Sequence, residues 1–77
     1  MSAAPRLEPP RPDPAEGLRA HGATLQAHAD RLREAADELE QQGPQAAAFR
    51  AEVAALADRC ATAADGLTLA AARLQER

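Results

Sequence analysis

Leucine recurs along the first half of the chain at a fixed interval of seven residues, and a small residue follows each leucine four positions later. This is the two-position heptad of packed helices, with large side chains on one row and small ones on the other. Small residues repeated on one row allow another helix to approach closely. The leucines are Leu18, Leu25, Leu32 and Leu39, and the small residues are Gly22, Ala29, Ala36 and Gly43.

The ends of this first helix are marked by local signals. Asp13 followed by Pro14 is typical of a helix start, with a capping carboxylate and then a proline at the first helical position. Gly43-Pro44 interrupts the pattern, since glycine ends helices in the left-handed conformation and proline suits the start of the next helix. The sequence therefore predicts a helix over residues 14–42 and a turn at Gly43 and Pro44.

A second apolar pattern begins directly after the turn, with gaps that alternate between three and four residues. It predicts a helix over residues 45–76, and Arg73 and Arg77 suit the negative C-terminal end of that helix. Ala57, Ala64 and Ala71 form a separate small-residue row beside the pattern. The pattern itself consists of Ala46, Phe49, Val53, Leu56, Cys60, Ala63, Leu67, Ala70 and Leu74.

Two long helices joined by so short a turn are expected to lie antiparallel, so the fold class predicted is all-α, a two-helix hairpin over residues 14–77. The apolar stripes are wider than one hairpin contact can cover, which favours a four-helix bundle made with a second hairpin. Residues 1–13 hold four prolines among charges and predict a flexible, extended tail.

The composition also indicates that the chain needs a partner to fold stably. Of the 77 residues, 22 are alanine, and leucine, valine and phenylalanine together number 11, too few to build the core of an isolated domain. We therefore expect the large side chains to meet another helical hairpin, in a hetero- or homodimer, or the helical domain of a secreted effector. The expected partner interface is Leu18, Leu25, Ala29, Leu32, Ala36, Leu39, Phe49, Val53, Leu56, Ala63, Leu67 and Leu74.

Charge and hydropathy exclude other partners. The formal net charge is −3, and the arginines are scattered, which argues against nucleic acid. We expect no membrane span, because no apolar stretch is long enough, and no cleavable signal peptide, because the N-terminal residues lack an apolar segment. Cys60 is the sole cysteine; it is either a small hydrophobe in a reducing cytoplasm or half of a symmetric bridge between two copies.

No residue pattern indicates catalysis, a cofactor or a metal. His21 and His28 lie two helical turns apart, too far to bind one zinc ion together. The carboxylates at positions 34, 37, 38 and 40 predict a solvated acidic patch near the turn, which Arg50 is expected to offset in part. We interpret the chain as a non-enzymatic interaction protein.

The turn region resembles that of the WXG-motif proteins, small helical hairpins associated with type VII (ESX) secretion in actinobacteria. The resemblance is carried by residues 42–50 (QGPQAAAFR) with Val53 and Leu56, and by helix-1 segments around Leu18 and Leu32. It implies a type VII secretion-associated partner or a chaperone-like subunit, cytoplasmic or exported with its partner.

Two family features are missing. Gln41 stands where the family has its turn tryptophan, and the chain contains no tyrosine for the C-terminal export signal. Membership would thus imply the signal-less member of a pair. Two alternatives stay open: a self-associating antiparallel coiled-coil scaffold in which Cys60 meets its own copy, and an antitoxin-like neutraliser of a neighbouring enzyme.

Overall fold

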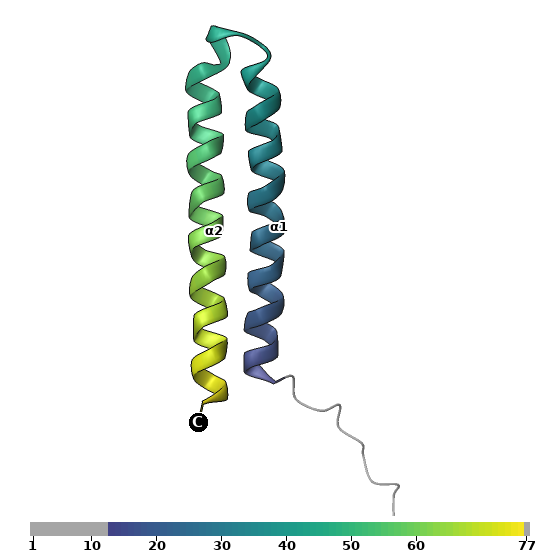
Figure 1. Cartoon of the computed structure of the whole chain (residues 1–77), viewed down its shortest axis with the longest axis vertical. Helices are drawn as coiled ribbons and strands as arrows, with labels where there is room; N and C mark the ends of the chain where they lie inside the picture. Colours follow the sequence, from purple (N-terminus) through teal and green to yellow (C-terminus); the bar gives the residue numbers. More distant parts are fainter. Residues whose placement is uncertain (1–12, 77) are drawn as a thin grey trace, which may run out of the picture.

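The computed structural model describes residues 13–76, which form two long helices packed side by side (Figure 1). Helix α1 spans Pro14–Glu40, the short 3-10 helix η1 spans Pro44–Ala46, and helix α2 spans Ala47–Gln75. The two α-helices run antiparallel, with η1 at one end of the hairpin (Figure 1). The predicted all-helical class and the packing of the two helices on each other are confirmed. The tail predicted for residues 1–13 lies outside the described residues apart from Asp13, as does Arg77.

The start of α1 follows from two neighbouring residues. The Asp13 side chain accepts a hydrogen bond from the backbone N–H of Ala15, at 3.0 Å, and Pro14 occupies the first helical position. The carboxylate thereby satisfies one of the N–H groups that a helix start leaves without a partner. The cap predicted at Asp13 is confirmed.

The turn differs in detail from the prediction. Helix α1 ends at Glu40, two residues before the predicted end, and a 3-10 turn precedes α2 where a continuous helix from residue 45 is predicted. Gly43 has a positive φ of 101°, but its ψ of −178° places it outside the left-handed helical region. The Gln45 side chain closes the turn by donating to the Gln42 carbonyl oxygen at 2.8 Å. The chain thus reverses through an extended mirror-image conformation that favours glycine.

The contact between the helices is built from small residues. In each helix the buried positions recur every seven residues, so one row of each faces the other. The buried residues are Ala15, Gly22, Ala29 and Ala36 on α1 and Ala57, Ala64 and Ala71 on α2.

The row on α2 corrects the predicted pattern. Only part of the alternating pattern adjoins α1. Val53, Cys60 and Leu67 are half-buried, whereas Leu56 is 45% exposed and Ala63 is also exposed, and the most buried row is the one through Ala64, which is 3% exposed. Small residues opposite alanine let the two backbones approach closely from the level of Ala15 and Ala71 to that of Ala29 and Ala57, which large side chains between them would prevent. Helix α2 is therefore rotated so that its alanine row is central and its larger side chains lie to one side.

Gly22 and Ala64 fix the register. A Cβ added at Gly22 would lie 3.3 Å from the Ala64 carbonyl oxygen. Heptad steps in opposite directions then place Ala29 at the level of Ala57 and Ala15 at the level of Ala71. Gly66, by contrast, has nothing within 4 Å of an added Cβ, so no contact within the hairpin requires a glycine at that position.

Candidate protein-interaction face

The large apolar side chains of the hairpin stand beside its contact and not within it. Among residues 13–76, every fully or nearly buried residue is an alanine or a glycine, and no leucine, valine or phenylalanine is buried. Four large hydrophobic residues are more than one-third exposed: Phe49 at 58%, Leu69 at 53%, Leu56 at 45% and Leu74 at 37%. All four lie on α2.

The larger apolar residues of both helices lie on one side of the hairpin, because they stand at the same offset from the buried row in each helix. In both helices the next apolar row stands three residues after a buried small residue, about 60° round the helix. A half-turn about an axis perpendicular to the plane of the two helix axes exchanges two antiparallel helices. Rows that hold the same position relative to the contact in each helix therefore lie on the same side of that plane. We call this surface the leucine face. It consists of Leu18, Leu25, Leu32 and Leu39 on α1 and Phe49, Val53, Leu56, Cys60, Ala63, Leu67, Ala70 and Leu74 on α2.

Burial along the leucine face is incomplete in the same way at both helices. The four α1 leucines, Val53, Cys60 and Leu67 are half-buried, each covered on the side that meets the other helix. Phe49, Leu56 and Ala63 stand farther out and are exposed. A surface of this kind retains part of its hydrophobic driving force for a further contact.

The opposite side of the hairpin is polar. Arg33 lies 3.7 Å from Asp30 on its own helix and 3.7 Å from Asp58 on α2, and Gln26 donates to Asp30 at 3.2 Å. The Arg33 and Asp58 side chains are 47% and 78% exposed, so this ion pair is a solvated one. Within residues 13–76 no ion pair joins Arg50 to the acidic patch, which is the partner predicted for that arginine.

The residues of the predicted partner interface divide between two places. Ala29 and Ala36 lie in the contact between α1 and α2, 0% and 6% exposed, and so face the chain's own second helix. The other ten lie on the leucine face. Within the hairpin, Ala64 takes the spacing role expected of Ala63. The turn residues Gly43 and Pro44 shape the reversal, and neither is part of the leucine face.

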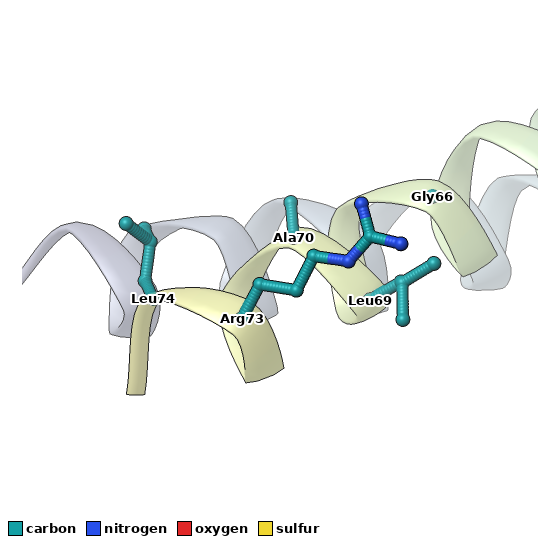
Figure 2. Close-up of a pocket in the computed structure, with 5 residues that line it drawn as sticks. All are labelled: Gly66, Leu69, Ala70, Arg73 and Leu74. Carbon is teal, nitrogen blue, oxygen red and sulfur yellow. The ribbon is translucent and has the colours of Figure 1, made fainter. Parts of the chain in front are cut away.

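An apolar hollow near the open end of the hairpin was not predicted from the sequence; of the residues that line it, only Leu74 belongs to the predicted partner interface. Its volume is about 350 Å³, and it lies on α2 (Figure 2). The Arg73 side chain lies along the helix toward Leu69, and its guanidinium group stands beside the hollow (Figure 2). The hollow is lined by Gly66, Leu69, Ala70, Arg73 and Leu74.

No known family, curated protein or solved structure matches this chain.

Other kinds of site find little support in the geometry of the hairpin. His21 and His28 are both exposed, and no three metal-binding side chains converge within residues 13–76. Neither described α-helix carries an apolar stretch that could cross a bilayer. The leucine face and the hollow that borders it are exposed apolar features of the described chain.

Proposed function

We propose that this chain is a non-enzymatic interaction subunit that pairs, through its leucine face, with a second helical hairpin to form a four-helix bundle. The observation that carries the proposal is that the described hairpin buries alanine and glycine while its leucines, valine and phenylalanine remain half-buried or exposed. Burying such side chains contributes about 1.5–3 kcal/mol each. A second hairpin would recover that free energy.

A helical partner fits this surface better than an extended peptide or a sheet. The leucine face follows one row on each of the two antiparallel helices, about 32 Å long on α1 and about 38 Å long on α2, and it offers no unpaired strand edge. Another pair of helices with apolar heptads would cover both rows at once, as in other four-helix bundles.

The secretion role rests on the resemblance to WXG-motif hairpins. We propose that the chain is the signal-less member of a type VII secretion pair, a partner or chaperone-like subunit carried by a hairpin that bears the export signal. The segment that carries the resemblance, residues 42–50, spans the observed turn, and Phe49 at its end is exposed on the leucine face.

Concentration-dependent unfolding tests the bundle. The full chain is heated at protein concentrations from high micromolar to low nanomolar, and helicity is followed by circular dichroism. A bundle of two hairpins melts at a temperature that rises with concentration, because association stabilises the folded state by mass action. A chain that stays helical and monomeric at the lowest concentration, with an unchanged Tm, contradicts the proposal.

A second experiment tests the secretion role separately. The chain is co-expressed with a hairpin encoded beside it that carries the turn tryptophan and the C-terminal tyrosine signal. We expect a one-to-one complex and release of both chains into the medium, lost when the partner's tyrosine is replaced. A chain that forms bundles only with itself, and stays in the cell in the presence of that partner, contradicts the secretion role while leaving the bundle intact.

A further inference from the structure

The two ends of α2 carry complementary shapes. Phe49, at the turn end, projects from the leucine face with 58% of its surface exposed. At the open end, the same outer row of α2 reaches Ala70, which lines the apolar hollow with Gly66 beside it. A large side chain at one end of a row and a hollow that borders the other end of the same row, through Ala70, is the arrangement of a self-complementary surface.

We infer that the occupant of the leucine face is a second copy of this chain, turned end for end, with Phe49 of each copy seated in the hollow of the other. This inference rests on the proposed four-helix bundle and names its partner. It does not rest on the secretion role, because a second copy and a signal-bearing hairpin would compete for the same leucine face. The outer row of α2 reads Phe49, Leu56, Ala63, Ala70. Turning the copy places Phe49 against Ala70 and Leu56 against Ala63, so each large side chain meets a small one.

Charge favours the same orientation. In this register Glu52 of one copy lies about 9 Å along the axis from the Arg73 backbone of the other, six residues at 1.5 Å each. The Arg73 side chain covers much of that distance, because it extends toward Leu69 and Gly66 (Figure 2). Its guanidinium group therefore stands near the level that Glu52 of the second copy would occupy.

The opposite orientation sets like charges together. With both turns at the same end, α2 of one copy lies over α1 of the other, and Glu52 falls at the level of Glu34. Glu38 lies one turn from Glu34 on the same helix, so a further carboxylate at this level would add repulsion. Turning the copy instead separates the two acidic turn ends by the length of the hairpin. The turned orientation also brings Arg59 near Arg59 of the second copy. Both side chains lie at the exposed edge of the interface, where they can extend into solvent and move apart, so their repulsion is small.

The register places Cys60 next to its own copy. The midpoint between Phe49 and Ala70 on α2 falls between residues 59 and 60, so the symmetry axis crosses α2 beside Cys60. Cys60 is a free, half-buried thiol on the leucine face. Val53 lies on the same row one heptad away, and its copy would be about 20 Å distant along the axis.

Thiol crosslinking tests this register. Oxidation of the full-length chain is expected to give a Cys60–Cys60 disulfide-linked dimer, because the two backbones lie within the short range that a disulfide requires. In the matched control, Cys60→Ala combined with Val53→Cys, the single thiol moves along the row and the crosslink is lost. A control that crosslinks as well as the unmodified chain overturns the register.

Filling the hollow with a larger side chain tests whether Phe49 of the second copy binds there. Gly66→Leu is expected to raise the dimer Kd by at least about tenfold, measured by analytical ultracentrifugation, and Phe49→Ala to do the same. Gly66→Ala supplies a similar gain in helix propensity with little added volume, and Ala72→Leu adds the same side chain at an exposed position outside the hollow. Both controls should leave Kd within about twofold of the unmodified chain.

The outcomes separate this inference from the proposed function. A dimer that ignores Gly66→Leu and Phe49→Ala, or a chain that is unfolded alone and folds only with a different hairpin, overturns the inference and keeps the bundle. A chain that is folded and monomeric at every concentration overturns both. Loss of binding in Gly66→Leu and Phe49→Ala but not in Gly66→Ala or Ala72→Leu, together with the Cys60 crosslink, supports both the inference and the four-helix bundle.

Discussion

Gly22 of α1 lies directly against Ala64 of α2: an added Cβ would stand 3.3 Å from the Ala64 carbonyl oxygen and 3.3 Å from the Thr68 hydroxyl oxygen. That hydroxyl itself donates to the Ala64 carbonyl at 3.0 Å. The closest approach of the two helices is therefore lined by backbone and by a side chain that is already committed to a hydrogen bond. Little there can move to admit a larger residue.

Replacing Gly22 with leucine should accordingly destabilise the hairpin. We expect the free energy of unfolding to fall by about 1–3 kcal/mol, measured by urea denaturation followed by circular dichroism. Gly17→Leu is the matched control, because an added Cβ there meets nothing within 4 Å; the better helix propensity should raise stability by up to about 1 kcal/mol. Equal effects of the two substitutions would show that helix separation is not set at Gly22.

The turn depends on Gly43. Its φ of 101° with ψ of −178° is a conformation that residues with a Cβ rarely adopt, so Gly43→Ala should cost about 1–3 kcal/mol of unfolding free energy. Contact with the Gln45 side chain, 2.9 Å from an added Cβ, adds little because that side chain can move. A double-mutant cycle with Gln45→Ala separates the two causes, because the single variant Gln45→Ala accounts for the lost hydrogen bond to the Gln42 carbonyl. Relief of contact would make Gly43→Ala less costly in the Gln45→Ala background, and backbone strain would leave its cost unchanged.

Local signals explain how much of this fold could be predicted. The cap at Asp13 and the break at Gly43-Pro44 act through neighbouring residues, so sequence alone places the first helix start and the reversal. The exact end of α1 at Glu40 and the 3-10 turn before α2 depend on how the two helices are joined in space. Gly43 was predicted to adopt the left-handed helical conformation, but an extended connection with positive φ spans the gap instead.

The rotation of α2 was harder to predict, because the helix carries two apolar stripes. The pattern through Leu56 and Ala63 is the longer and more regular, and the row through Ala64 is the smaller in volume. Packing decides between them: alanine facing the alanine row of α1 gives close backbone contact, and the choice cannot be read from one helix by itself. The hollow was missed for a related reason, since it is shaped by the absence of a side chain at Gly66 and by Leu69, which belongs to neither heptad row.

The ion pair between Arg33 and Asp58 should contribute little to stability. Both side chains are largely solvent-exposed and their closest charged atoms are 3.7 Å apart, a geometry in which measured coupling energies are usually below about 1 kcal/mol. A double-mutant cycle with Arg33→Ala and Asp58→Ala should give a coupling of about 0.5 kcal/mol or less. A larger coupling that vanishes at high salt would mean that the polar side helps to hold the hairpin together.

Leu32 and Leu56 should report on different contacts. Leu32 is half-buried against α2, so Leu32→Ala removes packing within the hairpin as well as across the leucine face. Leu56 is 45% exposed, so Leu56→Ala should affect association above all.

We expect Leu56→Ala to raise the dimer Kd about tenfold or more, and Leu56→Glu to leave only monomer with reduced helicity, because a charge would have to be buried in the bundle. Sedimentation equilibrium and circular dichroism on the same samples measure the two effects. Arg33→Ala, on the polar side, serves as the control and should leave Kd unchanged. If instead Leu56→Glu associates as tightly as the unmodified chain, the leucine face is not the surface through which this hairpin finds its partner.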